Sequence, residues 1–210
     1  MALLAFFIQN PVKMKYYLLL FVLAYFLLTF VLPTWRVRRQ TGINPFVVPD
    51  DDSAHGFIGK IFRLITVLVL AAVSVNAFAP GWGQYLLPVW YLETGGLRWL
   101  GWLLLHLSLL LILTAQFQMK KSWRIGIDEK NRSELVTDGL FRYSRNPIFL
   151  GMLTTMAGLF LVLPNALTLL AHVLTWVVLQ IQVRLEEEFL LKMHGAGYRQ
   201  YFEKTSRWVG

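Results

Sequence analysis

The sequence predicts an all-α, polytopic membrane protein with about five transmembrane helices. We expect the last two helices to form a tight hairpin that leads into a cytoplasmic C-terminal tail. The prediction rests on the composition, on the spacing of the apolar segments and on the distribution of basic residues. Of the 210 residues, 56% are hydrophobic and only 15% are charged, which is more apolar and less charged than a soluble domain.

Five apolar segments give the predicted helices in chain order. They cover residues 16–32, 57–79, 97–117, 147–163 and 166–183. Each is close to the roughly 20 residues that cross a hydrocarbon core of about 30 Å. The basic stretch WRVRR follows the first segment as a stop-transfer signal, so we interpret that segment as a membrane span and not as a signal peptide. We therefore expect a single integral membrane domain over residues 1–210.

The basic residues predict how these helices are oriented. Seventeen of the 20 Lys and Arg residues fall in residues 36–63, 120–145 and 184–207, after the first, third and fifth segments. The positive-inside rule then places the amino terminus outside and the carboxyl terminus in the cytoplasm, as in a bacterial inner membrane. Because these residues flank membrane helices, we interpret the net charge of +8 as topology signals and contacts with membrane lipid. No nucleic-acid partner is expected.

The cysteine content and two loops narrow the chemistry further. The chain has no Cys, which excludes disulfides, thiolate metal sites and a cysteine nucleophile. Asp50, Asp51, Asp52 and His55 can be considered as metal ligands, but consecutive carboxylates usually repel one another and stay solvated, so we expect no metal. The aromatic loop at residues 78–96 fits a belt at the outer membrane interface.

The fourth segment begins with charged and turn-forming residues, in the stretch GLFRYSRNPIFLG at residues 139–151. Asn146 is a favoured helix cap, and Pro147 suits the first helical position. Arg142 and Arg145 then lie beside the positive end of the helix dipole, where guanidiniums and backbone N–H groups can bind an anion. The alternative interpretation is that both arginines only snorkel at the membrane boundary.

The fifth segment brings acidic residues to the same end of the protein. Only Pro164 and Asn165 separate it from the fourth segment, which predicts an antiparallel hairpin. If the fifth helix continues to Leu191, it is roughly 39 Å long. Glu186 and Glu187 then lie outside the hydrocarbon, at the level where the fourth helix begins.

These residues together predict a pocket that faces the cytoplasm. Arginines and helix N–H groups form one wall, glutamates form the other, and a tail with Tyr and Arg covers the top. Such a pocket suits a zwitterionic ligand. Glu187 shares a helical face with Trp176, Gln180 and Val183, whereas we expect Glu188 to be solvated. Replacing Glu186 and Glu187 with Gln is expected to weaken ligand binding and leave the protein able to fold.

Other polar and small residues inside the helices have simpler interpretations. A stripe on the fourth helix is typical of close helix packing and less often of a ligand groove; it consists of Gly151, Thr154, Thr155 and Gly158. His106 and His172 lie within helices and are interpreted as structural, although intramembrane polar residues merit testing.

The C-terminal half resembles a known superfamily. LVTDGLFRYSRNPIFLG, followed after the hairpin by RLEEEFLLKMHGAGYRQYFEKTSRWVG, is similar to the isoprenylcysteine carboxyl methyltransferases and phospholipid methyltransferases over residues 122–210. The superfamily pattern falls on Arg145, Asn146, Pro147, Phe149 and Gly151, on Glu186, Glu187 and Leu190, and on Gly195, Tyr198, Tyr201, Arg207 and Trp208. Asn146 stands where the carboxyl methyltransferases have His, and Phe149 stands where Tyr is commoner.

The resemblance implies a membrane methyltransferase that uses S-adenosylmethionine. Residues 1–121 would be N-terminal transmembrane helices and residues 122–210 the catalytic, cofactor-binding half. A lipophilic or amphiphilic acceptor would reach the methyl group from the bilayer. The implied catalytic residues are Arg145, Arg142 and Arg207. The implied cofactor contacts are Asn146, Pro147, Gly151, Glu186, Glu187, Tyr198 and Tyr201.

Two other functions fit parts of the same pattern. A membrane reductase of the sterol-reductase type resembles the superfamily in its C-terminal architecture and would use NADPH, but it normally needs a longer chain with more helices. A non-enzymatic scaffold or lipid-binding protein would use the charges for topology alone. The grouping of Arg, Asn-Pro and Glu-Glu across one hairpin argues against a scaffold.

Overall fold

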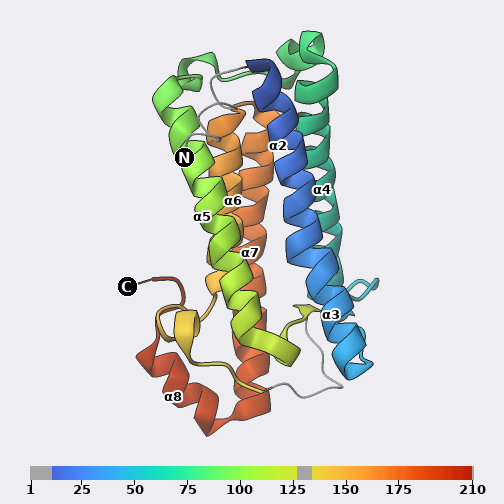
Figure 1. The fold of residues 1–210 in the computed structure, drawn as a ribbon. Helices are drawn as coiled ribbons and strands as arrows, with labels where there is room; N and C mark the ends of the chain where they lie inside the picture. The colour runs from blue at the N-terminus through green and yellow to red at the C-terminus, as the bar shows by residue number, and fades with distance from the viewer. Residues whose placement is uncertain (1–10, 127–133, 210) are drawn as a thin grey trace.

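Most of the chain is helical in the computed structural model, which describes residues 11–126 and 134–209 (Figure 1). The first long helix consists of α2 (Pro11–Phe26), a π-helical turn η1 (Leu27–Val31) and α3 (Leu32–Thr41). The others are α4 (Ala54–Phe78), α5 (Gly95–Met119), α6 (Pro147–Val162), α7 (Ala166–His194) and the short α8 (Ala196–Lys204). These elements confirm the predicted all-α class.

The long helices have the lengths and compositions of membrane spans. Within residues 11–126 and 134–209, four segments are long and apolar enough to cross a bilayer: Lys13–Thr41, Ala54–Phe78, Gly95–Ser122 and Ala166–His194. The predicted fourth span is α6, a shorter apolar helix of 16 residues. The described part of the chain is therefore that of a polytopic membrane protein, with four long apolar helices and one shorter one.

A small parallel ladder joins two loops and was not predicted from the sequence. Strand β1 (Phe46–Val47) pairs with β2 (Ile125–Gly126). Each strand has two residues, which is too short for an alternating pattern to be visible. The remaining short elements are the 3₁₀ turns η2 (Pro80–Leu86), η3 (Trp90–Leu92), η4 (Lys120–Ser122) and η5 (Gly139–Arg142).

Two aspartates of the loop before α4, Asp50 and Asp51, have protein partners. Asp50 accepts a hydrogen bond from Arg63 Nη2 at 3.1 Å, and Asp51 accepts one from the Ser53 backbone N–H at 3.1 Å. Over residues 11–126 and 134–209, His, Asp and Glu form no group of three or more that could hold a metal ion. These contacts position the start of α4, whose first turn Ser53 caps through a hydrogen bond from Gly56 N.

The predicted hairpin of α6 and α7 is present. Asn165 Oδ1 accepts a hydrogen bond from Thr168 N at 3.1 Å, and Thr168 Oγ1 accepts one from Asn165 N at 3.3 Å. This capping box fixes the turn between the two helices. α6 packs against α5 and α7, and α7 packs against α4, so the helices run side by side in Figure 1. The hairpin brings the start of α6 and the end of α7 to the same end of the bundle.

Glycines allow α5 and α6 to approach closely. A Cβ atom on Gly101 would lie 2.8 Å from the Gly158 carbonyl oxygen, and one on Gly158 would lie 2.9 Å from the Gly101 carbonyl oxygen. Closer to the start of α6, a Cβ atom on Gly151 would lie 2.4 Å from Ile112 Cγ1. The face with Gly151 and Gly158 is thus a close helix-packing surface, as the small-residue stripe predicts.

We expect Gly101→Ala to destabilise the protein by about 1–3 kcal/mol, because the new methyl group would overlap the α6 backbone and force the helices apart. Thermal unfolding of the purified protein in detergent would measure the change. Gly96→Ala is the matched control, since it lies on the same helix and its Cβ would meet nothing within 4 Å. Equal unfolding temperatures for the two variants would contradict the packing.

The orientation in the membrane is a separate prediction from the distribution of basic residues. We expect a reporter fused after Gly210 to be cytoplasmic, because the three segments richest in Lys and Arg lie on that side of the predicted spans. A pair of reporters, one active only in the cytoplasm and one active only outside it, would check the assignment. A C-terminal fusion that is active only outside would reverse the topology.

Candidate functional site

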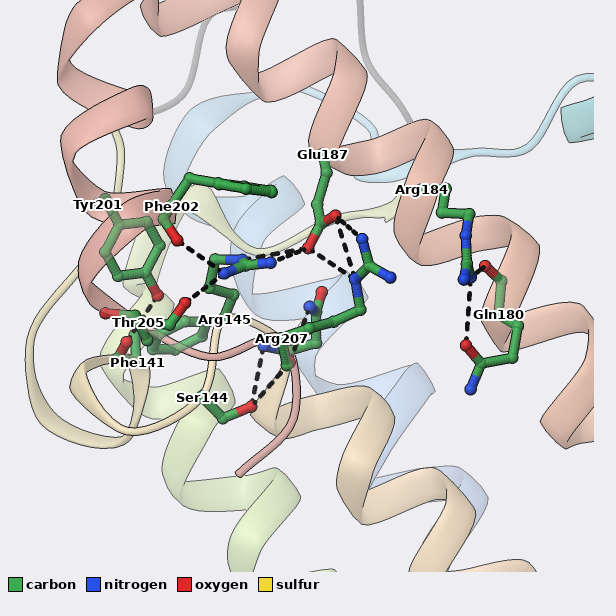
Figure 2. Close-up of polar contacts among 11 residues, drawn as sticks. Phe141, Ser144, Arg145, Gln180, Arg184, Glu187, Tyr201, Phe202, Thr205 and Arg207 are labelled. Atoms are coloured by element: carbon green, nitrogen blue, oxygen red, sulfur yellow. Dashed lines mark hydrogen bonds and ion pairs between the residues drawn. The ribbon is translucent and has the colours of Figure 1, made fainter. Parts of the chain in front are cut away.

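Three parts of the chain meet at one end of the hairpin. Arg145 lies just before α6, Glu187 lies on the last part of α7, and Arg207 lies in the tail that follows α8. Figure 1 shows α8 at the same end of the bundle as the start of α6. Figure 2 shows both arginine side chains pointing toward the Glu187 carboxylate.

Glu187 is bridged by both arginines. Arg145 donates to Glu187 Oε1 through Nε at 3.1 Å and through Nη2 at 2.8 Å. Arg207 donates to Glu187 Oε2 through Nη2 at 2.6 Å and through Nε at 3.2 Å, with a further contact from Nε to Oε1 at 3.1 Å. The side chains of Arg145 and Glu187 are 7% and 8% exposed, whereas that of Arg207 is 29% exposed. We call these three residues the ion cluster.

The remaining N–H groups of Arg145 bind the chain around α8. Its Nη1 donates to the Phe202 carbonyl oxygen at 2.9 Å and also to the Thr205 carbonyl oxygen. Its guanidinium carbon lies 4.0 Å from the centre of the Phe202 ring, in the geometry of a cation–π contact. Arg145 therefore connects α7, α8 and the tail at once. A residue that only snorkels at the membrane boundary does not need these several contacts of a planar guanidinium.

The tail is held against the start of α6 by backbone groups. Arg145 N donates to the Ser206 carbonyl oxygen at 2.9 Å. The Arg207 carbonyl oxygen accepts from Ser144 Oγ at 3.3 Å and from Asn146 Nδ2 at 3.2 Å. These bonds place the Arg207 side chain over Glu187. The sequence gives no sign of these bonds, because both acceptors, the carbonyl oxygens of Ser206 and Arg207, are backbone groups some 60 residues away.

The start of α6 is as predicted, but the role of Asn146 is different. The helix begins at Pro147, and Asn146 makes no side-chain capping bond. Its side chain turns instead to the Arg207 carbonyl oxygen, and its backbone N–H donates to Ser144 Oγ at 3.1 Å. The prediction that Asn146 caps the helix through its side chain is therefore wrong, because the tail competes for the amide.

The two tyrosines of α8 are buried beside the ion cluster. Tyr198 is 1% exposed, and its ring centre lies 6.0 Å from that of Tyr201. Tyr201 donates from its hydroxyl to the Phe141 carbonyl oxygen at 2.6 Å. Burial raises the pKa of Tyr201 to about 12, and it raises the pKa of Tyr198 as well. Both phenols are therefore protonated at neutral pH and can donate hydrogen bonds, but neither suits a general base.

The other predicted site residues have varied environments. Arg142 ends η5 and is exposed. Glu186 is half-buried next to Glu187, and Glu188 is exposed. Pro147 is buried at the start of α6, and Gly151 faces α5.

Sequence reasoning missed Gln118 as a support of the site. Gln118 Oε1 accepts a hydrogen bond from Leu140 N at 2.9 Å. Gly139, with φ of +66°, would place a Cβ atom 2.4 Å from Gln118 Nε2, so a side chain there would displace Gln118. This contact anchors η5 to the end of α5 and so sets where the following Arg145 lies.

His106 makes structural hydrogen bonds within the bundle. Its Nδ1 lies 2.8 Å from the Trp102 carbonyl oxygen, which can only accept, so Nδ1 carries a proton. Its Nε2 lies 2.8 Å from the Tyr17 hydroxyl. The first bond lies within α5 and the second joins α5 to α2, which agrees with the structural interpretation of this residue.

The fold and the site define an integral membrane protein with a charged cluster at the end of its last hairpin. Residues 97–197 match the phospholipid methyltransferase family. The chain is also similar to protein-S-isoprenylcysteine O-methyltransferase of Schizosaccharomyces pombe, with 33% identity over 72 residues, which are 34% of this chain and 30% of that protein. Both matches support the isoprenylcysteine carboxyl methyltransferase and phospholipid methyltransferase superfamily, so the resemblance drawn from the motifs is confirmed.

Proposed function

We propose that the protein is an integral membrane methyltransferase that uses S-adenosylmethionine and acts on a lipophilic or amphiphilic acceptor. The observation that carries this proposal is the ion cluster, which lies at the start of α6. Two of its members, Arg145 and Glu187, fall within the region that matches the phospholipid methyltransferase family. In this proposal residues 122–210 carry the cofactor site within a single membrane domain.

The chemistry of the cluster suits the amino-acid end of the cofactor. Two guanidiniums share one carboxylate, so the three side chains together carry one excess positive charge. A zwitterionic group brings a carboxylate for an arginine and an ammonium for a glutamate, and it can therefore replace an internal ion pair without leaving a charge unpaired. Arg207 is the more exposed of the two arginines and is the natural partner for an incoming carboxylate.

The other predicted residues complete the proposed site. Glu186 and Glu187 would hold the cofactor ammonium or ribose hydroxyls, and Tyr198 and Tyr201 would line the adenosine side. Asn146, Pro147 and Gly151 would shape the start of α6 beneath the cofactor. The bound cofactor would supply an electrophilic methyl group on a sulfonium. The protein would contribute positioning and the exclusion of water, which can supply most of the acceleration in an in-line displacement.

We propose that the acceptor enters from the bilayer side. The relative from Schizosaccharomyces pombe is named for an isoprenylcysteine substrate, in which a hydrocarbon chain accompanies the reacting group. Arg142, which is exposed beside the start of α6, would orient an anionic acceptor.

Binding of radiolabelled S-adenosylmethionine to the purified full-length protein would test the proposal, with NADPH as the comparison. We expect saturable binding of S-adenosylmethionine that an excess of S-adenosylhomocysteine displaces, and none of NADPH. Saturable binding of NADPH alone would favour a reductase. Binding of neither ligand would favour a protein without this enzymatic function.

A further inference from the structure

The first long helix carries a proline next to its π-helical turn. In an α-helix the Thr29 carbonyl oxygen would accept a hydrogen bond from the N–H of residue 33, but that residue is Pro33 and has no N–H. Within η1 the bonding pattern changes, and Leu32 N donates to the Leu27 carbonyl oxygen, five residues earlier. Prolines and π-helical turns are the usual places at which a helix bends. Residues 27–33 therefore form a hinge between α2 and α3.

One side chain from another helix stabilises this hinge. Gln116 Nε2 donates to the Thr29 carbonyl oxygen at 2.7 Å, so it supplies the hydrogen bond that Pro33 cannot make. Gln116 is 8% exposed, and within residues 11–126 and 134–209 its Oε1 is buried without a hydrogen-bond partner. A single hydrogen bond thus holds this amide and joins the hinge to α5. We call this bond the latch.

The first helix also meets α5 in a second place, nearer the start of both helices. There the Tyr17 ring centre lies 4.9 Å from that of Trp102, and the Tyr17 hydroxyl lies 2.8 Å from His106 Nε2. A cavity of about 20 Å³ lies between this aromatic contact and the latch, and its lining side chains come from α2, α4, α5 and α6. Most of them are apolar; Tyr25 and Thr155 are the members with hydroxyl groups.

The latch lies at the end of the bundle that carries the ion cluster. Ile112 of α5 packs on Gly151 of α6. Because the two helices run in opposite directions, one further turn places Gln116 level with Pro147, where α6 begins. Figure 1 shows α3 at the same end of the bundle as α8. An opening at the latch would therefore lead from the bilayer toward the start of α6.

We propose that the latch closes a lateral gate in the bundle. Release of Gln116 from Thr29 lets the first helix swing at its hinge, and a hydrocarbon chain from the bilayer then passes between η1 and α5 into the cavity. Leu27 and Val31 of η1 are 48% and 55% exposed, and Phe117 beside the latch is 64% exposed, so lipid reaches both helices at this level. A cavity of about 20 Å³ holds about one water molecule, so a chain enters only when the helices part.

The gate rests on the proposed function for the identity of this chain, which would belong to the methyl acceptor. Passage of hydrocarbon through the gate does not itself require the cofactor. The gate can therefore be tested with a simple hydrocarbon probe and without methyl transfer.

Photolabelling of the full-length protein in phosphatidylcholine vesicles would test the gate, with a diazirine-bearing fatty acid as the probe and no S-adenosylmethionine added. Mass spectrometry would compare adducts on the cavity residues Tyr25 and Met156 with those on Val67, an exposed residue of α4. We expect Gln116→Leu to raise cavity labelling relative to Val67 about three-fold or more, because loss of one hydrogen bond shifts the closed and open populations by several-fold.

Further variants separate opening of the gate from a general loss of packing. Ser108→Ala is the matched control, since it removes a buried hydrogen bond of 2.8 Å between α5 and Thr155 of α6 and leaves the latch intact. Pro33→Ala supplies a backbone N–H for the Thr29 carbonyl oxygen. The double variant Pro33→Ala, Gln116→Leu should therefore label the cavity less than Gln116→Leu alone. Gln116→Asn keeps the amide but shortens its reach, and it serves as a milder variant in the same comparison.

The proposal is overturned if Gln116→Leu and Gln116→Asn label the cavity no more than Ser108→Ala does. It is also overturned if Pro33→Ala leaves the labelling of Gln116→Leu unchanged. Because neither comparison uses the cofactor or methyl transfer, a failure of the gate is distinguishable from a failure of the proposed function, which binding of S-adenosylmethionine tests separately.

Discussion

Glu187→Gln is expected to lower the free energy of unfolding by about 3–5 kcal/mol, because it leaves two guanidiniums without the carboxylate between them. The side chain is 8% exposed and accepts hydrogen bonds from Arg145 and Arg207. The same change should weaken binding of S-adenosylmethionine ten-fold or more, since hydrogen bonds to charged groups contribute roughly 1.5–3 kcal/mol each. Chemical unfolding in detergent and labelled-cofactor binding would measure the two effects.

Substitutions of the two neighbouring glutamates separate an effect on protein stability from an effect on cofactor binding. Glu188→Gln removes an exposed carboxylate, and we expect little change in either measurement. Glu186 is half-buried, and no salt bridge to it is formed among the described residues, so Glu186→Gln should affect cofactor binding more than stability. If Glu187→Gln were as stable as Glu188→Gln, the ion cluster would not hold the hairpin and tail together.

The structure changes the result expected for the glutamate pair. Position along the chain places both residues near the end of a membrane helix, and from this alone both substitutions would be compatible with folding. Burial of Glu187 depends on the tail, which is brought over α7 by bonds to the carbonyl oxygens of Ser206 and Arg207. Such backbone contacts between distant segments have no pattern in the sequence.

The helices could be predicted from the sequence where an apolar segment of sufficient length begins at residues that favour a helix start. α6 begins at Pro147 as predicted and ends at Val162, one residue before the predicted end. α7 extends to His194, beyond the apolar segment 166–183. This agrees with the prediction that the fifth helix continues past that segment to Leu191. Hydrophobic periodicity and the Asn-Pro step are local signals, so they fix local boundaries well.

The π-helical turn in the first helix shows what local signals miss. Gln116 on α5 donates from Nε2 to the Thr29 carbonyl oxygen at 2.7 Å, although the two residues are 87 positions apart. The π-helical turn therefore contains a carbonyl that accepts a hydrogen bond from another span. Only the packed bundle brings the two together, so residues 27–31 look like ordinary membrane helix in the sequence.

Sequence motifs select all three residues of the ion cluster, but they do not indicate the contacts among them. Arg145, Glu187 and Arg207 are all among the residues that the motifs select. Sequence spacing suggests that arginines and glutamates face each other across a pocket, whereas they form direct ion pairs in the structure. Attraction between opposite charges in a partly buried site favours this closure. A cofactor at this position must therefore exchange partners with the cluster.

Arg145→Lys is expected to reduce both cofactor binding and methyl transfer ten-fold or more, although it keeps the positive charge. Arg145 uses three nitrogens to reach Glu187, the Phe202 carbonyl oxygen and the Thr205 carbonyl oxygen. A lysine ammonium is a single point of charge and cannot span these acceptors in one plane. It also loses the contact of the planar guanidinium with the Phe202 ring.

Two further variants, Arg145→Ala and Pro147→Ala, are expected to be more and less impaired, respectively, than Arg145→Lys. The alanine variant at 145 removes the charge as well and should be at least as impaired as the lysine variant. Pro147→Ala should be milder, because it removes only the pre-organised first residue of α6. Cofactor binding would be measured for all three variants below their unfolding temperatures, on protein that elutes as a monodisperse peak. This control separates an effect on the site from unfolding. Near-normal binding and turnover by Arg145→Lys would mean that a positive charge at the membrane boundary is sufficient for cofactor binding and methyl transfer. Arg145 would then be a snorkelling residue, and its guanidinium geometry would serve only to hold the tail.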